Sequence, residues 1–250
     1  MLVSIITTFY NAEKTIQDTI DSIADQSYKN IEVIFVDGLS SDNSLKIVKS
    51  NLKRFSNYKL ISEKDDGIYD GMNKGIMNAS GDIIAILNAD DIYSHDAIEN
   101  VVNLFTKELD LLACTINKFN KVLSDGVVIK RSEMKPLSPL NPTVHHPGIF
   151  VRRQVYDKYG LFDLRYRISA DFDFIGRIIN KGVKIGYTDL VTTHMRSGGA
   201  SDSFKFHFKK NLEHIIIGYR NRTSKFQFLK YAFYVLKKFV YGLLVFLKLK

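Results

Sequence analysis

Residues 2–23, LVSIITTFYNAEKTIQDTIDSI, carry the pattern from which the fold can be predicted. The β-branched apolar run at residues 2–8 is typical of a strand that is buried on both faces. A polar turn follows, and apolar residues then recur every three or four positions over residues 12–23, which predicts a helix. This stretch is therefore one strand, one turn and one helix.

The same unit recurs through the first half of the chain. None of its apolar strands alternates with polar residues, and each is followed by a helix, which is typical of a parallel sheet covered on both faces. The sequence therefore predicts an α/β, doubly wound fold. The further strands are expected at 31–36, 58–62 and 82–87, their polar turns at 37–42, 63–66 and 88–91, and the helices at 45–52, 68–76 and 97–105.

The pattern is less regular after Cys114. A hairpin is expected to turn at residues 124–126, and all four prolines of the chain fall within residues 136–147. Beyond this loop we expect strands at 149–152, 183–188 and 191–194, and a helix at 172–180. No fixed-period repeat or low-complexity linker is seen, so residues 1–203 are expected to form one catalytic domain.

Composition excludes several classes of protein. The chain has 250 residues, of which 45% are hydrophobic and 25% charged, so collagen-like, disordered and disulfide-scaffold proteins are excluded. The single cysteine, Cys114, has no partner for an internal disulfide, and Met1 leads directly into the first strand without the pattern of a signal peptide. We therefore expect a cytoplasmic, reducing compartment.

The net charge of +8 is concentrated at one end of the chain. Residues 204–250 hold 11 Lys or Arg and one acid, Glu213, whereas the first 203 residues hold 24 basic and 26 acidic residues. A nucleic-acid-binding domain usually spreads its basic residues over the face that follows the phosphates, so no nucleic-acid partner is expected. Residues 204–250 are instead predicted to be a separate basic, aromatic helical tail.

The tail has the features of an interfacial helix. Between residues 226 and 249 its longest uncharged run has nine residues, which is short of the roughly 20 that a spanning helix needs. On a helical projection its lysines share about a third of the circumference, and aromatic and aliphatic residues take the rest. This favours an amphipathic helix lying on an anionic membrane surface. The alternative is packing on the protein's own body or on a second protomer in a homodimer.

The strand-end turns carry carboxylates rather than phosphate-binding glycine loops. Neither G-x-G-x-x-G nor G-x-x-x-x-G-K-[ST] occurs, which argues against dinucleotide oxidoreductases and P-loop enzymes. Asp37, Asp65, Asp66, Asp90 and Asp91 all follow predicted strands, and such turns meet at one edge of a parallel sheet. Adjacent carboxylates suit Mg²⁺ or Mn²⁺, which in turn attracts a diphosphate. The alternative for Asp90 and Asp91 is capping of the next helix.

Five strings are spread through the chain: VSIITTFYNAEKTI at 3–16, IEVIFVDGLSSDNS at 31–44, EKDDGIYDGMNKGI at 63–76, GDIIAILNADD at 81–91 and SADFDF at 169–174. Together they resemble a family 2 glycosyltransferase with a GT-A fold. They run in the family's order through about the first 195 residues, and the similarity is greatest to bacterial enzymes that build O-antigen, capsule or exopolysaccharide. The resemblance implies a Rossmann-like, mostly parallel sheet, with a nucleotide-binding half at 1–115 and an acceptor half at 116–203.

The resemblance also implies roles for residues that bind the donor. Asp37 is expected to bind the uracil edge, although the family usually has a second Asp where this chain has Gly38. Asp91 is implied as the ligand of a Mn²⁺ or Mg²⁺ cofactor, with Asp90 contacting ribose or sugar. Asp70 and Lys74, four residues apart, match positions near the nucleotide and donor sugar, but helix capping and surface charge explain these two residues equally well. The further residues implied at the nucleotide and donor sugar are Thr7, Tyr10, Glu13, Asp66, Asn73 and Lys74.

The resemblance places the catalytic base at Asp171. Asp171 matches the second residue of the family's E-D motif, and Ala170 stands at the first. With Asp171 as the base, the resemblance implies a single displacement that inverts the anomeric carbon. His145 and His146 are open to two interpretations, an acceptor contact or a buried structural role. His194 is either a further metal ligand or a core histidine.

The leading hypothesis is a metal-dependent inverting glycosyltransferase. It would move a hexose or N-acetylhexosamine from a UDP-sugar to a lipid-linked saccharide in cell-surface polysaccharide biosynthesis, at the inner face of the membrane. The alternative is a non-catalytic, sugar-nucleotide-binding or scaffolding subunit, in which Gly38 and Ala170 reflect lost activity. A nucleotidyltransferase would need a Gly-rich, basic first loop, which residues 7–14 do not provide.

Overall fold

The computed structural model describes residues 1–119, 128–132, 145–197 and 204–221, and the pairs 228–229, 232–233 and 236–237. Side chains are described in these segments except at 128–132 and 204–208. The turn predicted at 124–126, the first three prolines and most of the predicted tail helix lie outside the described residues.

The first half of the chain has the predicted order of elements. Four strands, β1 (Val3–Phe9), β2 (Ile31–Asp37), β3 (Tyr58–Ser62) and β4 (Ile83–Ile86), are parallel and lie in the order β3-β2-β1-β4. Their carboxyl ends therefore meet at one edge of the sheet. The helices between and after them are α1 (Ile16–Ala24), α2 (Ser44–Asn51) with the 3₁₀ turn η1 (Leu52–Arg54), α3 (Ile68–Asn78) and α4 (Ala97–Leu104).

The second half extends the same sheet with mixed strand directions. Strand β8 (Ile149–Arg152) runs antiparallel to both β4 and β6 (Leu111–Phe119), and β9 (Ile185–Arg196) runs parallel to β6. β6 pairs with β8 along its first residues and with β7 (Val128–Ser132) along its last ones. The remaining elements are β5 (Ile92–Tyr93), η3 (His146–Gly148), α5 (Arg153–Tyr159), α6 (Ala170–Ile179) and α7 (Phe204–Arg220).

Two predicted strands are one element in the structure. β9 is continuous from Ile185 to Arg196, but its register against β6 shifts after Thr188, and pairing resumes at Val191. The two residues between them form a bulge, which the sequence pattern presented as a break between strands. The two-residue strand β5 and the helix α5 were not predicted.

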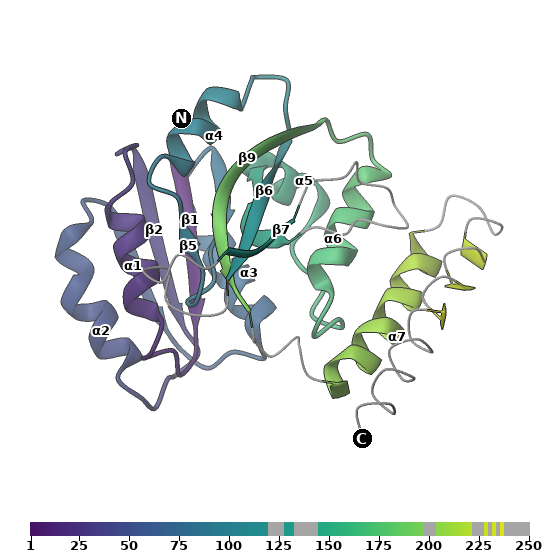
Figure 1. Ribbon diagram of the computed structural model, residues 1–250, viewed down its shortest axis with the longest axis horizontal. Coiled ribbons are helices and arrows are strands. Elements are labelled where there is room, and N and C mark those ends of the chain that lie inside the picture. The colour runs from purple at the N-terminus through teal and green to yellow at the C-terminus, as the bar shows by residue number, and fades with distance from the viewer. Residues whose placement is uncertain are drawn as a thin grey trace.

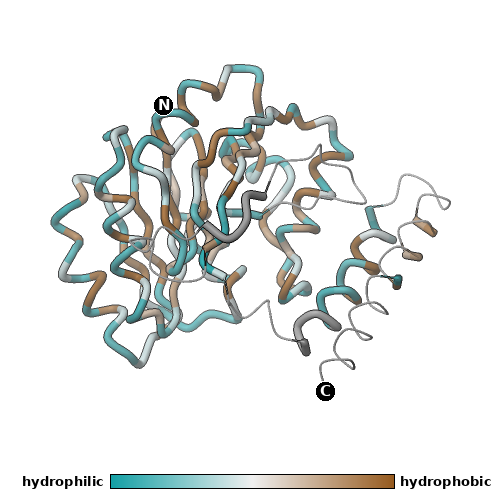
Figure 2. Tube along the Cα trace, in the orientation of Figure 1, coloured by the Kyte–Doolittle hydropathy of each residue, from teal (hydrophilic) through white to brown (hydrophobic). Residues whose placement is uncertain are grey.

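The hydrophobic core lies on both faces of the sheet. Ile5 faces the cluster that includes α1 and α2, whereas the next residue, Ile6, faces the cluster that includes α3, α5 and α6. Successive strand residues point to opposite faces, so a strand covered on both sides must be apolar throughout. The central strands accordingly appear as nearly continuous hydrophobic segments between more polar helices (Figures 1 and 2).

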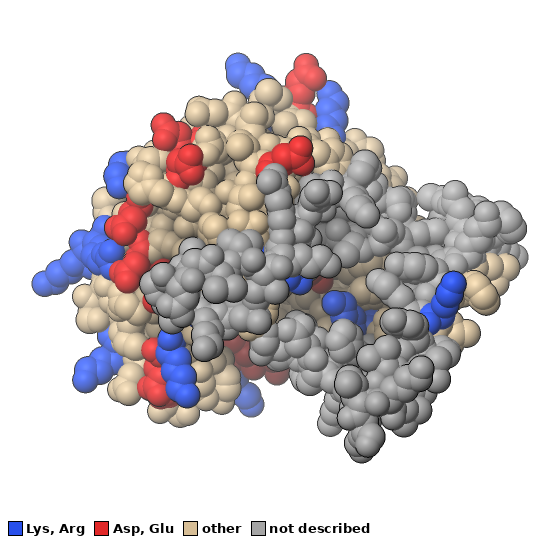
Figure 3. All heavy atoms as spheres, viewed as in Figure 1, with Lys and Arg blue, Asp and Glu red and all other residues tan. Residues whose placement is uncertain are grey.

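Helix α7 is packed against the body of the molecule. It lies beside α6, at the end farthest from α1 and α2 (Figure 1). Its Ile217 is fully buried in the α3–α5–α6 cluster. Among the helices in the described part of the chain, none has the length and apolar character needed to cross a bilayer. In the face shown in Figure 3, acidic and basic side chains are interspersed around α1 and α2.

Candidate active site

The first edge of the site is formed by the ends of β1 and β2. Thr7 and Thr8 are buried at the end of β1, and neither hydroxyl has a hydrogen-bond partner among the described residues. Buried hydroxyls are nearly always partnered, so each of these two, on opposite faces of β1, marks a position where a ligand or water completes the structure. Nearby, Tyr10 is 63% exposed, and the Glu13 carboxylate accepts hydrogen bonds from the backbone N–H and side-chain amide of Asn43.

Asp37, at the end of β2, is fully buried. Its Oδ1 accepts a hydrogen bond from the backbone N–H of Ser40 at 2.9 Å, and its Oδ2 accepts one from the Ser62 hydroxyl at 2.8 Å. The carboxylate therefore ties the loop after β2 to the end of β3.

Asp90 and Asp91 follow the end of β4, and Asp90 is half-buried whereas Asp91 is buried. Asp91 is 1% exposed, and its carboxylate accepts hydrogen bonds from the Arg196 backbone N–H at 3.0 Å and the Asn88 amide at 3.1 Å. Burial raises the pKa of Asp91 well above its usual range, and the charge of Asp90 raises it further; burial also raises the pKa of Asp90. A divalent cation would stabilise both carboxylates in their charged form, so this pair fits a metal.

His194 does not complete a preformed metal site. Within the described residues, no three His, Cys, Asp or Glu side chains gather as a metal-binding group, so Asp90, Asp91 and His194 do not form one. The His194 Nε2 lies 3.2 Å from the Ser94 hydroxyl, and burial lowers the pKa of the ring. A metal at Asp90 and Asp91 would take its other ligands from substrate oxygens or water.

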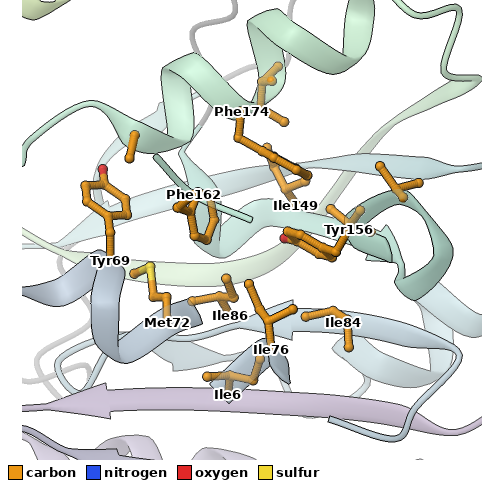
Figure 4. Packing of buried hydrophobic residues seen from close by; sticks show 14 of the residues in the cluster. Ile6, Tyr69, Met72, Ile76, Ile84, Ile86, Ile149, Tyr156, Phe162 and Phe174 are labelled. Carbon is orange, nitrogen blue, oxygen red and sulfur yellow. The ribbon is translucent and has the colours of Figure 1, made fainter. Parts of the chain in front are cut away.

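Asp171 lies in the first turn of α6 with its two carboxylate oxygens in different surroundings. Oδ1 accepts hydrogen bonds from the Tyr69 hydroxyl at 2.9 Å and the Phe172 backbone N–H at 2.8 Å. Oδ2 lies 3.7 Å from Nδ1 of His146. Figure 4 shows Tyr69 extending from α3 beside Phe162, with its hydroxyl toward the side of the core that carries α6. One oxygen is therefore held in place, and the other faces an ionisable ring.

The same contacts determine the charge of Asp171. Burial raises its pKa, but the nearby His146 ring, together with the hydrogen bonds from Tyr69 and Phe172, lowers it by more. The net effect places the pKa of Asp171 below its usual range. The carboxylate is therefore ionised at neutral pH and able to accept a proton.

A continuous chain of polar contacts joins Asp171 to Asp91. His146 Nε2 lies 3.0 Å from the Asn88 Oδ1, and the Asn88 amide donates to Asp91 Oδ2. The structure thus brings the predicted base and the predicted metal ligand together through Asn88 and His146. Sequence reasoning gave no role to Asn88 or Tyr69, although each lies inside a string that resembles the family.

Three other predicted donor-binding residues make contacts within the fold. Both polar atoms of the Asn73 amide bond the backbone of Phe162, at 2.9 and 3.0 Å. The Lys74 ammonium donates to the Lys64 carbonyl at 2.6 Å and pairs with Glu63 and Asp70. Asp66 is exposed, and its backbone N–H donates to Asp70. Their roles toward a donor stay predictions, as does that of His145, whose pKa is lowered to about 4, chiefly by burial.

Comparison with known protein families shows to which family the chain belongs. Residues 4–160 match the family described as glycosyl transferase family 2. The chain belongs to this family. The relatives of this glycosyltransferase include a PGL/p-HBAD biosynthesis glycosyltransferase of Mycobacterium bovis, 28% identical over 80% of this chain and 79% of the relative. Another is the minor teichoic acid biosynthesis protein GgaB of Bacillus subtilis, 28% identical over 77% of this chain but only 23% of GgaB.

Solved structures show that this glycosyltransferase has the GT-A fold. S. aureus TarS 1-349 in complex with UDP-GlcNAc matches 94% of this chain and 72% of its own with a TM-score of 0.72 at 18% identity. A mannosyltransferase from Pyrobaculum calidifontis, in complex with GDP-Man and Mn²⁺, matches 93% and 68% with a TM-score of 0.69 at 17% identity. The predicted family and fold class are confirmed.

In this glycosyltransferase, α7 holds the loop that leads to Asp171. The Glu213 carboxylate, 6% exposed, accepts hydrogen bonds from three successive backbone N–H groups, those of residues 167–169, at 2.9 to 3.1 Å. Ser169 is the N-cap of α6 but makes no side-chain cap, and its hydroxyl has no partner among the described residues. Glu213 therefore binds the donors at the start of the helix that carries the predicted base.

Proposed function

We propose that this glycosyltransferase transfers a hexose or N-acetylhexosamine from a UDP-sugar to a hydroxyl of a lipid-linked saccharide, with inversion, in cell-surface polysaccharide biosynthesis. The observation that carries the proposal is the contact chain from Asp91 through Asn88 and His146 to Asp171. It supports the proposal because it connects Asp91, the carboxylate proposed to bind the metal, with Asp171, the proposed base. The names of GgaB and of the UDP-GlcNAc complex of TarS support the choice of donor and pathway.

The two oxygens of Asp171 have separate tasks in this proposal. Oδ1 is engaged by Tyr69 and Phe172, so Oδ2 is the oxygen that accepts the proton of the acceptor hydroxyl. As the acceptor oxygen bonds to the anomeric carbon, the bond from that carbon to the diphosphate breaks and UDP leaves. A single displacement of this kind inverts the anomeric centre.

Asp90 and Asp91 would hold the divalent cation, Mn²⁺ or Mg²⁺. The cation would neutralise the charge that develops on the departing diphosphate. Asn88 orients the Asp91 carboxylate from one side, and the Arg196 backbone N–H orients it from the other. The enzyme would work on the inner face of the cell membrane, bound peripherally through its basic tail, which is proposed from the sequence of residues 204–250.

A donor screen tests this function. Purified protein is mixed with each of a set of UDP-sugars, membrane extract as acceptor, and either Mn²⁺, Mg²⁺ or EDTA, and released UDP is measured. We expect UDP to be released from one of the donors, and this release should require both the metal and the acceptor. In Asp91→Asn the release should fall to background. A matched Asp157→Asn variant, changed on the exposed face of α5, should keep full activity. Binding of UDP without any release would contradict catalysis and support the scaffolding alternative.

A further inference from the structure

Helix α7 exposes a row of large apolar side chains, Leu212, Ile216 and Tyr219, which we call the outer stripe. Their side chains are 44% to 51% exposed, and their spacing of four and three residues places them on one face of the helix. Ile217, by contrast, is fully buried against the body of the molecule. Apolar surface that continues along a helix face and stays open to solvent usually marks a contact with a protein or a lipid.

The tail repeats this pattern next to the outer stripe. Leu229, Phe233 and Leu236 have the same spacing and are 55% to 71% exposed. The rings of Tyr219 and Phe228 are 5.3 Å apart at an angle of 75°, so the start of the second set lies beside the end of the first. The two sets therefore meet at the end of the molecule that carries α7 (Figure 1).

The charge of this region fits an anionic surface. Glu213 is the single acid of residues 204–250, and it is buried, with its carboxylate turned inward to three backbone N–H groups. Among the described side chains of α7, the exposed charged ones are both basic, Lys209 and Arg220, although Arg220 also lies 3.8 Å from the Asp163 carboxylate.

The same charge opposes a dimer through this face. Eleven basic residues and one acid give residues 204–250 a net charge of +10. A second copy of the chain would bring this charge against itself, and like charges across an interface are unfavourable. A layer of anionic lipid headgroups attracts it instead.

We propose that the outer stripe of α7 rests in the headgroup layer of an anionic membrane, beside the tail. This inference rests on the peripheral attachment in the proposed function and assigns part of that attachment to the folded body. Three half-exposed side chains bind a bilayer only weakly, so the outer stripe adds to the lysines of the tail and does not replace them.

The position of the outer stripe has a consequence for the acceptor. Helix α7 holds the loop before α6 through Glu213, so the helix that touches the membrane also positions Asp171. The predicted base is thereby kept at a fixed distance from the lipid surface. A fixed distance suits an acceptor that is itself attached to lipid.

The first test uses tryptophan as a reporter, because the chain has none. Tyr219→Trp places it in the outer stripe, and Tyr58→Trp, at a 45% exposed side chain on the edge strand β3, is the matched control. Each variant of the full chain is titrated with vesicles of phosphatidylcholine and phosphatidylglycerol in equal parts, with or without brominated acyl chains. We expect the emission of Tyr219→Trp to shift to shorter wavelength and to be quenched by brominated lipid, and that of Tyr58→Trp to stay unchanged.

Sedimentation and light scattering of the same samples separate the outcomes. Vesicle binding with unchanged emission from Tyr219→Trp would overturn the role of the outer stripe and leave the tail as the anchor. Absence of vesicle binding by the full chain would overturn the proposed membrane location as well. A doubled mass without lipid, together with the spectral shift, would show that a second copy covers the outer stripe and would also overturn the proposal.

The second test removes apolar surface from the outer stripe and keeps the tail. A protein with Leu212→Ser and Ile216→Ser is compared with one that carries Leu104→Ser and Leu190→Ser, at similarly exposed side chains of α4 and β9. Because two large apolar side chains lose their contact with lipid, we expect the first protein to bind vesicles at least about 10-fold more weakly than the wild type. The second should bind as the wild type does, and thermal melting verifies that both fold. Equal vesicle affinities of the two proteins would contradict the proposal.

Discussion

The chemistry of the site depends on the unequal surroundings of the two oxygens of Asp171. A carboxylate that is hydrogen-bonded through one oxygen keeps a fixed orientation, and its other oxygen stays available for a proton. Tyr69, from α3, and Phe172 hold Oδ1, whereas His146 faces Oδ2. The lowered pKa is the sum of burial, which raises it, and the contacts of His146, Tyr69 and Phe172, which lower it by more.

Replacement of His146 should therefore change the pH dependence of transfer. In His146→Ala, burial still raises the pKa of Asp171, but the neighbouring imidazole that lowered it most is gone. The pKa of Asp171 rises, so the base becomes protonated at a higher pH. We expect the acid limb of the profile of kcat/KM against pH to move to higher pH. His95→Ala, a change at an exposed histidine, serves as control; an acid limb at the same pH in all three proteins would contradict the coupling.

Helix α7 contributes to the site although it follows the sheet in sequence. Glu213 accepts three backbone N–H groups in the loop before α6, the Phe172 ring stacks on His214 with centroids 4.1 Å apart, and Asn180 donates to the Asn221 carbonyl. Helix α7 therefore helps to position the predicted base, although its basic residues had led us to expect it as part of a separate tail.

Glu213→Gln tests this contribution. Glutamine keeps the shape but has one acceptor oxygen and no charge, so the loop at 167–169 loses hydrogen bonds to a charged group. We expect a loss of about 1–3 kcal/mol in the free energy of unfolding and a lower kcat, with the Kd for UDP unchanged. Differential scanning fluorimetry, steady-state kinetics and titration measure the three quantities. Glu108→Gln, at a well-exposed side chain, is the matched control; equal melting temperatures and kcat in the two variants would refute the role of Glu213.

The elements could be predicted where periodicity is strong. The pattern of strands buried on both faces and helices with one apolar stripe predicted β1 to β4 and α1 to α4, in order and with boundaries within a few residues. The bulge in β9 and the two-residue strand β5 have no periodic signal, because they depend on pairing with distant strands.

The acidic residues of the candidate site could be predicted from the sequence, but the hydrogen bonds and contacts that link them could not. Asp91 and Asp171 follow from their places after a strand and at the start of a helix, together with the resemblance. Asn88 and His146 are 58 residues apart, and Tyr69 and Asp171 are 102 apart, so their contacts exist only in the folded chain. The same holds for Asn73, whose amide is engaged by Phe162.

The molecule as a whole places its site at the junction of two halves that share one sheet. Asp91 comes from the parallel half, and His146 and Asp171 come from the half that begins after α4. Both halves must therefore keep their relative position for transfer to occur. The basic residues beyond α7 are expected to bring this assembled site to a membrane surface.

Removal of residues 223–250 tests the membrane prediction. The deleted segment carries six lysines, each contributing about 1 kcal/mol near an anionic surface. The full chain should sediment with vesicles that contain anionic lipid, less so in high salt, and the truncated chain should stay in the supernatant while still binding UDP. Equal sedimentation of the two proteins would contradict the tail as the membrane anchor.

The most direct test of the catalytic account is the rate of sugar transfer by Asp171→Asn, with its UDP affinity measured on the same preparation. Asparagine preserves the size of the side chain but cannot take up the acceptor proton. A general base contributes about 10²–10⁴-fold, so transfer should fall by that factor while UDP binds as in the wild type. Transfer at the wild-type rate by Asp171→Asn would contradict the account.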